Sequence, residues 1–456
     1  MPALSLKIEA FPMRNTLTLL AAALAMGFSA GVLAADLIEL YDQALATNPT
    51  LKGSEYAIDQ ANAQKDEAMS KLLPQVSAVG ILSWNHYTQS GITSTSLTTT
   101  QNYPGSRGVI QARQVLFYLP DYLRLQGAGA TVQQRDLELE ATHMSVAADL
   151  IDRYFTVLEA IDEMSAVQGE KALTEGEMKR IRRMNEMQLS PVTDLYEVEA
   201  YYQSLITREI EIENERLVGL EKLRELAGIP VSTVAPLTRD RLPDVPGMAD
   251  EWVRDATQQN PALVALQYAI DANEKIIASS RAEHLPQLSL QLSEIYADNG
   301  GYDNRSLGGR YTVGTVGLQL SIPIYSGGGL EAGVREAVAN YQIALEKKAQ
   351  KLREIERETR TAYLDARAGR ARIDSTAKEV ESREKARDAQ ERSYELGIAT
   401  IVAVLESKKN LLKARFEQAQ ARYHYIRSLA ALRLWAGNLT RQSLEDTNTW
   451  LAKAGK

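Results

Sequence analysis

The sequence contains no cysteine and only four histidines among its 456 residues. Without cysteine the chain can form no disulfide, no thiolate nucleophile, no cysteine-based zinc site and no lipidated N-terminal cysteine. The histidines lie far apart, and none of them stands in the HxxxH or HxH spacing of a metal site. They are His86, His143, His284 and His424. We therefore assign them structural or surface roles, and we expect no metal and no cofactor.

Catalytic motifs are missing as well. No HExxH, GxSxG, Walker or GxGxxG pattern occurs in a fitting context, and no histidine lies near a plausible nucleophile. The glycine-rich stretch 326–329 (SGGG) could indicate an anion site at the start of a helix, but no Gly-Lys-Ser/Thr follows it. We interpret this stretch as a hinge between a strand and a helix, and we do not expect an enzyme.

Long apolar runs are confined to the N-terminus. Arg14 precedes an apolar stretch, residues 16–35, which ends in small residues and offers a cleavage site after Ala34 or Ala35. This pattern predicts a secretory signal peptide over residues 1–34. No other stretch approaches 18 apolar residues, so we expect no transmembrane helix. An exported chain of this kind could span a membrane only as a β-barrel.

The chain is acidic, with a formal net charge of −8 at pH 7. The first 34 residues carry Lys7, Glu9 and Arg14, a net charge of +1, so the remainder carries −9. A nucleic-acid-binding surface needs an excess of basic residues. We therefore expect no nucleic-acid partner.

The chain is duplicated. Residues 48–75 begin NPTLKGSEYAID, residues 260–287 begin NPALVALQYAID, and 10 of the 28 aligned positions are identical. A unit of about 200 residues is too long for the common short repeats and corresponds to half of the molecule. We expect the first repeat at residues 35–228 and the second at 249–437. A proline-rich linker, 229–248, joins them, and a tail, 438–456, follows.

Each half predicts the same order of elements: helix, two strands, a long helix and a second long helix. Asp36 is expected to cap a short first helix, and Asn48–Pro49 restarts it with a capping side chain and a proline at the first helical position. We expect the strands at about 75–90, 106–118, 286–298 and 310–325. We expect the long helices at 121–187, 191–226, 330–396 and 400–436, with the capping device repeated at Ser190–Pro191.

Four prolines are expected at the junctions between helices and strands, because proline removes a donor where the two hydrogen-bonding patterns change over. Pro74 and Pro286 mark the entries into the strands. Pro120 and Pro323 mark the returns to helix.

The long helices carry the seam of a coiled coil. Apolar residues recur at alternating spacings of three and four, as a coiled coil requires: Leu137, Ala141, Met144, Ala148, Ile151, Phe155 and Leu158. The expected helix over residues 121–187 would form a rod of roughly 100 Å. From the helices alone, a coiled-coil structural protein of the cell envelope is as good an interpretation as a protein that spans a membrane.

The strands decide between these interpretations. Residues 286–294 and 310–322 alternate apolar side chains with uncharged Gln, Ser, Thr and Gly. Each segment has about the length of a tilted barrel strand in an outer membrane. Four strands cannot close a barrel, and an open edge cannot stay in lipid. Two chains would pool eight strands, and three chains would pool twelve, enough to surround a lumen. A transport conduit follows.

The chain resembles the TolC family of outer-membrane efflux and secretion proteins over essentially its whole length after the signal peptide. The resemblance is carried, in order, by RYFTVLEAIDEMSAV (153–167), LPQLSLQL (285–292), GLQLSIPIYSGGG (317–329) and ELGIATIVAVLESKKNLLKARFEQAQARYHYI (395–426). It implies a mixed α and β fold in which a homotrimer shares a 12-stranded transmembrane β-barrel, with four strands per chain. The barrel would continue as a coiled-coil tunnel through the periplasm, with the tail near an equatorial girdle.

The resemblance also implies location and partners. It places the chain in the outer membrane of a Gram-negative bacterium, in contact with outer-membrane lipid. Its partners would be a periplasmic adaptor (membrane fusion protein) and an inner-membrane RND pump or ABC exporter. Drug efflux and type I protein secretion are equally compatible with these residues. The nearest alternative is a periplasmic adaptor, which should show one hairpin and several small β-domains rather than two hairpins.

In this family the periplasmic end of the tunnel is closed by links between neighbouring coiled coils. The resemblance assigns such links to Thr193 and Asp194 in the first hairpin and to Tyr394 in the second. It places Glu406 in an acidic ring around the lumen. An acid complementing the helix dipole is the alternative for Asp194, and ordinary packing is the alternative for Tyr394.

The two tips depart from the family pattern at three positions. Ala399 replaces an expected arginine, Ala403 replaces an expected acid, and Gln188 stands where glycine is usual. Closure would then depend on hydrogen bonds, or on Arg182 or Arg183 nearby. The resemblance assigns adaptor docking to the tip residues Gln188, Leu189, Ser190, Gly397, Ile398 and Ala399.

Overall fold

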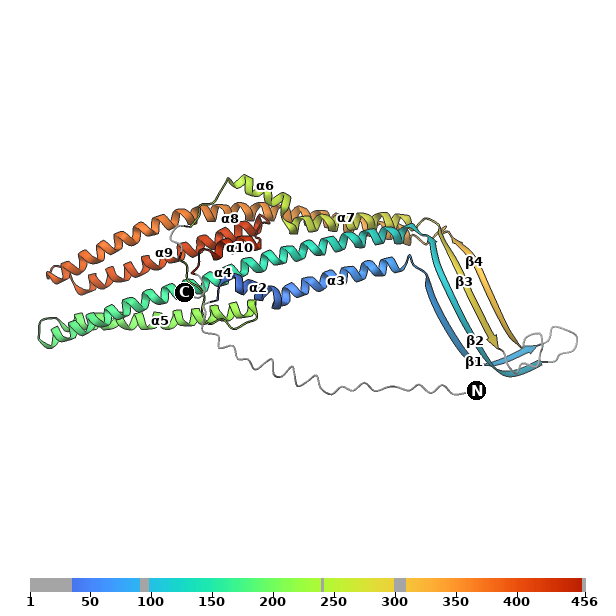
Figure 1. Cartoon of the computed structure of the whole chain (residues 1–456), viewed down its shortest axis with the longest axis horizontal. Helices are drawn as coiled ribbons and strands as arrows, with labels where there is room; N and C mark the ends of the chain where they lie inside the picture. Colours follow the sequence, from blue (N-terminus) through green and yellow to red (C-terminus); the bar gives the residue numbers. More distant parts are fainter. Residues whose placement is uncertain (1–34, 91–97, 239–241, 299–308, 453–456) are drawn as a thin grey trace.

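A computed structural model describes residues 35–90, 98–238, 242–298 and 309–452. The expected signal peptide, residues 1–34, lies outside these ranges. The molecule is elongated, with helices along most of its length and one curved sheet at an end (Figure 1). No described helix is both long and apolar enough to cross a membrane.

The two halves of the chain repeat one order of elements. The first half contains α2 (Leu37–Thr47), α3 (Pro49–Ser70), β1 (Gln75–Ser90), β2 (Thr98–Phe117), α4 (Leu119–Glu186) and α5 (Val192–Ala227). The second half contains α6 (Ala249–Gln259), α7 (Pro261–Ala282), β3 (Gln287–Asp298), β4 (Arg310–Ser321), α8 (Gly329–Glu395) and α9 (Ile401–Trp435), followed by α10 (Arg441–Asn448).

Helix α4 runs along most of the helical part (Figure 1). Its 68 residues extend about 100 Å at 1.5 Å per residue. It packs against α3 and α7 toward the sheet and against α5 and α9 toward the opposite end. Helix α8 pairs with α7 and then with α9 in the same way. Each hairpin therefore consists of one long helix with two shorter partners placed end to end.

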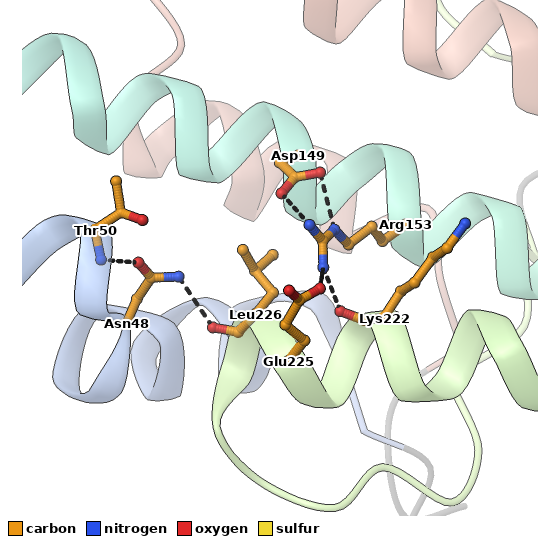
Figure 2. A network of polar contacts seen from close by, with 7 residues as sticks. All are labelled: Asn48, Thr50, Asp149, Arg153, Lys222, Glu225 and Leu226. Carbon is orange, nitrogen blue, oxygen red and sulfur yellow. Dashed lines mark hydrogen bonds and ion pairs between the residues drawn. The ribbon is translucent and has the colours of Figure 1, made fainter.

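The repeated Asn-Pro pair builds the joint between those shorter partners. The Asn48 side chain accepts from Thr50 N at 2.9 Å and donates through Nδ2 to Leu226 O, the end of α5, at 3.3 Å (Figure 2). Asn260 accepts from Ala262 N at 3.0 Å and donates to Trp435 O at 2.9 Å. The predicted cap at Asn48 is confirmed, Asn260 makes the equivalent cap in the second half, and each amide also holds the end of the neighbouring helix.

Two further polar devices support this region. The Asp36 side chain accepts from Glu39 N at 2.7 Å, which confirms the expected cap of α2. Arg153 of α4 pairs with Asp149 at 2.9 Å and with Glu225 of α5 at 2.8 Å, and it donates to Lys222 O at 2.6 Å (Figure 2). The last turn of α5 is thus fixed to α4.

The largest apolar core lies at this same level, where the short helices and the C-terminal helix surround α4 and α9. Most of the predicted seam belongs to it: Met144, Ile151, Phe155 and Leu158 are buried, while Leu137, Ala141 and Ala148 are partly exposed.

The four strands form one antiparallel sheet in the order β1-β2-β3-β4. The predicted start of the second strand at 106 is wrong, because β2 begins at Thr98 and pairs with β1 from Thr98↔Ser90 to Arg113↔Gln75. Pairing with β3 begins only at Ser106. Pro104 therefore lies where β2 has a single neighbour, an edge position that tolerates proline.

Strand β4 is shorter than predicted. Its last residue, Ser321, pairs with Gln287, which is the first residue of β3. Residues 322–325 consequently have no strand partner, and the predicted extension to 325 is wrong.

The four prolines lie at or near the changes between helix and strand. Pro74 and Pro286 immediately precede β1 and β3, Pro323 lies between β4 and α8, and Pro120 is in the first turn of α4. The second hairpin helix, α5, begins one residue later than expected: Pro191 is its N-cap, and Ser190 makes no capping bond to the backbone.

Gly437 tests the joint at the end of α9. Its φ is +74°, and an added Cβ would lie 2.6 Å from Asn260 Cα. We expect Gly437→Ala to destabilise the folded protein by about 1–3 kcal/mol or more, since a left-handed conformation and a backbone clash add together. Thermal unfolding in detergent measures this loss.

Gly333→Ala is the matched control, because Gly333 lies inside α8 with nothing within 4 Å of an added Cβ. It should stabilise by about 0.5–1 kcal/mol. If Gly437→Ala and the unmodified protein have equal melting temperatures, this account of the joint is wrong.

Candidate functional site

Both hairpins end in the same turn. In the first, Gln188 has φ +61°, and Leu189 N donates to Met184 O at 2.8 Å. In the second, Gly397 has φ +75°, and Ile398 N donates to Ser393 O at 2.9 Å. This six-to-one bond across a left-handed residue is a common way to end a helix.

Gln188 is the one non-glycine residue with positive φ in the described part of the chain. A side chain in this conformation costs roughly 1 kcal/mol or more relative to glycine. The first tip therefore adopts the glycine-type turn without glycine, at an exposed position.

A hydrogen bond joins the two tips within one chain. Tyr394, near the end of α8, donates its hydroxyl to Asp194 Oδ2 at 3.1 Å, across 200 positions of sequence. Ser190 donates to the same oxygen at 3.4 Å. Asp194 lies in the first turn of α5, where its charge also complements the helix dipole. We refer to the Tyr394–Asp194 contact as the tip latch.

The tip latch covers an apolar cluster. Ile181, Val198, Ile401, Val404 and Leu405 are buried there, with Tyr394 packed against them. These residues come from α4, α5, α8 and α9, so the cluster joins the two hairpins. Tyr394 thus has a packing role and a polar role together.

The surroundings keep Tyr394 protonated. Burial raises the pKa of its hydroxyl, and the Asp194 charge and hydrogen bond raise it further, while Arg180 acts in the opposite direction. Arg180 itself pairs with Glu177 at 2.5 Å. Tyr394 therefore remains a hydrogen-bond donor throughout the neutral pH range.

The other expected gate residues are not joined to the latch within the chain. Thr193 and Glu406 are exposed, and the described residues offer neither side chain a hydrogen bond. Arg182 pairs with Glu199 at 2.8 Å, and Arg183 donates to Lys179 O at 3.3 Å. Both arginines are used inside their own hairpin, so neither replaces the arginine expected at Ala399 by contacting Asp194 in the same chain.

The tip surface is apolar. Leu189 is 69% exposed and Ile398 is 78% exposed. Gln188 and Gly397 are also exposed, whereas Ala399 is partly buried. Ser190, which the resemblance assigns to the docking tip, is buried, and its carbonyl accepts from Asn185 Nδ2 at 2.8 Å.

A second connection joins the hairpins nearer the core. Glu159 of α4 accepts from Gln420 Nε2 of α9 at 3.1 Å and pairs with Arg427. One turn further, Asp162 accepts from the Tyr423 hydroxyl. We call these contacts the upper lock.

Between the upper lock and the tip latch, polar residues interrupt the apolar seam. Glu170 Oε1, Thr174 Oγ1 and Tyr201 OH are buried without a hydrogen-bond partner in the described structure. Lys408 is also buried there and pairs with Glu391 at 3.2 Å. The cost of such unpaired groups weakens the contact between the hairpins in this polar layer.

The polar layer could have been found in the sequence. Val167, Glu170, Thr174, Met178 and Ile181 follow one another along α4 at spacings of three or four residues, as seam positions do. A glutamate and a threonine therefore occupy positions that belong to the seam.

Among the described residues, no group of three or more His, Asp or Glu side chains is placed to hold a metal ion.

Comparison with known proteins places the whole chain among outer-membrane channels. A family described as outer membrane efflux protein matches residues 40–229 and 252–438, one match in each half. The chain is 27% identical to outer membrane protein TolC of Vibrio cholerae over 97% of this chain and 100% of the relative. It is 25% identical to the alkaline protease secretion protein AprF of Pseudomonas aeruginosa, over 95% and 91%.

Solved structures agree on the fold. The Campylobacter jejuni CmeC outer membrane channel superposes with a TM-score of 0.77 at 16% identity, over 100% of this chain and 99% of that one. The outer-membrane channel OprN gives 0.76 at 18% identity, over 88% and 90%.

Glu170 gives the polar layer a pH dependence. Burial raises its pKa above the ordinary value of 4.5, although Lys408, Arg387 and Arg415 oppose this and Glu391 adds to it. A raised pKa in the folded state means that ionised Glu170 destabilises the folded protein at neutral pH. This destabilisation disappears as the pH falls below the pKa that Glu170 has in the unfolded chain. Glu170→Gln should therefore raise the melting temperature by about 2 °C at pH 7.5 and leave it unchanged at pH 4.

Glu197→Gln, an exposed acid of α5, should change neither value. A gain for Glu170→Gln that persists at pH 4 would show that the ionised carboxylate is not the cause.

Proposed function

The chain belongs to the outer membrane efflux protein family, and we propose that three copies of it assemble into one duct through the outer membrane and the periplasm. The protein is an outer-membrane exit duct of the kind that serves efflux pumps and type I secretion. Its partners in that role are a periplasmic adaptor and an inner-membrane RND pump or ABC exporter. The alternatives of an adaptor or a coiled-coil spacer lack support, because the chain has two hairpins and a strand pair in each half.

The sheet supports the trimer. Strands β1 and β4 are its outer strands, and each has one neighbour within the chain. Unpaired backbone groups cannot be left in hydrocarbon. Pairing β1 of one chain with β4 of the next satisfies both edges, and three chains give twelve strands around a lumen.

The apolar tips support docking to the adaptor. Leu189 and Ile398, with the neighbouring Met187 and Leu396, are all more than half exposed at the end of the molecule farthest from the sheet. An exposed apolar patch of this kind is typical of a protein interaction site.

The tip latch is the single observation that supports a gate. Each latch is a hydrogen bond to an ionised carboxylate, and such bonds contribute roughly 1.5–3 kcal/mol. Three latches around one pore reach the 5.5 kcal/mol or so that moves a two-state balance from 1:99 to 99:1. Opening the periplasmic end requires the two hairpins of each chain to separate at the latch.

Removal of the latch should open the duct. Asp194→Ala combined with Tyr394→Phe is expected to raise single-channel conductance several-fold in planar bilayers, with the oligomer intact on native gels. Tyr196→Phe combined with Glu197→Ala makes the same chemical changes at exposed positions one turn or less away and should conduct like the unmodified protein. Unchanged conductance of the latch variant would place closure elsewhere along the tips.

Glu406 tests the proposed acidic ring. Three carboxylates around a pore concentrate cations, so Glu406→Ala should move the reversal potential in a KCl gradient toward zero and weaken block by multivalent cations. Glu221→Ala removes an exposed acid of α5 far from the tip and should leave both unchanged. A cation preference that survives Glu406→Ala would remove Glu406 from the ring.

A further inference from the structure

The two faces of the sheet differ in shape. The strands bend together into one curved sheet (Figure 1). Side chains on the concave face of such a sheet are shielded by their neighbours. Ser289 and Ala297 of β3 are 2% and 3% exposed, whereas Leu292, which points to the opposite face, is 40% exposed. The face that contains Ser289 is therefore the concave face.

The faces also differ in polarity. The convex face carries apolar side chains in register, including Leu290 opposite Leu318 and Leu292 opposite Val316. The concave face carries Ser289 opposite Gln319 and Gln291 opposite Gly317. An apolar outside and a polar inside are what a barrel in lipid requires. In the proposed trimer the concave face thus lines the lumen.

Two arginines lie on the concave face. Arg113 of β2 pairs in register with Gln75 and Gln291, and Arg107 pairs with Ile81 and Ala297. Both arginines are exposed, and neither makes a hydrogen bond or ion pair in the described part of the chain.

No acid opposes these charges on the concave face of the described strands. The acids of the strands, Glu294 and Asp298, fall in register with Ile110 and Ser106 on the convex face. Asp298 also pairs with Arg310 at 2.8 Å on that side. The concave face therefore carries positive charge alone, in a chain that is acidic as a whole.

Assembly multiplies this charge. The six residue steps from Arg107 to Arg113 correspond to about 20 Å along a strand. Three chains would place six guanidinium groups in two tiers of the lumen. Charge of one sign inside a low-dielectric wall focuses the field and raises the local concentration of the opposite ion.

We propose that Arg107 and Arg113 form two arginine tiers inside the barrel that bind and favour anionic solutes, above all those with several phosphate or carboxylate groups. The guanidinium fork suits both groups, because it can donate two parallel hydrogen bonds to either. This proposal rests on the duct proposed above and adds a specificity to its membrane segment. The barrel then prefers charge of the sign opposite to that favoured by an acidic ring at the periplasmic tip.

The experiment isolates the barrel from the tip. The background carries Asp194→Ala, Tyr394→Phe and Glu406→Ala, so that neither the latch nor the acidic ring dominates the current. Reversal potentials are measured in a KCl gradient across planar bilayers, and inositol hexakisphosphate is added on the barrel side as a probe. The background should prefer chloride and should be blocked by the probe.

Arg107→Gln with Arg113→Gln should abolish the chloride preference and raise the half-blocking concentration at least about tenfold, the change that follows loss of one charge-assisted hydrogen bond. Each single variant should lie in between, so the test does not depend on assembly of the double variant. The double lysine variant keeps the charge and should retain the chloride preference. Arg310→Gln removes an arginine from the convex face of the same sheet and should behave like the background.

The outcomes separate the two proposals. If the double glutamine variant conducts with the same reversal potential as the background and is blocked equally well by the probe, the arginine tiers are overturned. The proposed duct is then unaffected. Absence of any conductance in the background and in the unmodified protein contradicts the duct, and the arginine tiers with it.

Discussion

The unpaired edges of the sheet are the constraint on which the rest of the molecule depends. A chain with four strands leaves backbone donors and acceptors of β1 and β4 without partners, and hydrocarbon supplies none. In the proposed trimer, closure between chains satisfies them and brings the helices of the three chains side by side as the wall of a tube. Every feature described in one chain is thereby repeated around an axis. Single weak contacts such as the tip latch, and single charges such as Arg107, then act as rings.

The duplicated joint explains how the tube changes its construction partway along. Helices α4 and α8 continue through this level, whereas their shorter partners end there and new ones begin. The amides of Asn48 and Asn260 satisfy the groups exposed at both ends of each break. Gly437 allows the chain to turn away beside Asn260, where an added Cβ would lie only 2.6 Å from Asn260 Cα. The repeated sequence that stands out most in the chain is the one that builds this joint.

Features determined by neighbours in sequence could be predicted, and features determined by distant partners could not. The caps at Asp36, Asn48 and Asn260 follow from one or two residues each, and the alternation of β3 and β4 follows from a period of two. The start of β2 was missed because Thr98 is a strand residue only through its pairing with Ser90. The break between the helices at 187 and 191 was predicted, but the positive φ of Gln188 was not, because no glycine indicates it.

The site shows the same division. Asp194 and Tyr394 are 200 positions apart, and resemblance to a family, not any local pattern, singled them out. Glu170 and Thr174 carried a readable signal as polar residues at seam positions. The concave placement of Arg107 and Arg113 required the register of three strands.

The upper lock makes each hairpin a lever. From Glu159 to the end of α4 at Glu186 the helix extends about 40 Å, and within that arm the unsatisfied polar layer separates the upper lock from the tip latch and its apolar cluster. With the upper lock as the fulcrum, a tilt of about 10° displaces the tip by roughly 7 Å, a motion of the hinge type that packed helices permit. In the proposed duct, a partner bound to the tips would move them over a long distance through a small tilt, while the membrane end of the chain, on the far side of the upper lock and the joint, would stay still.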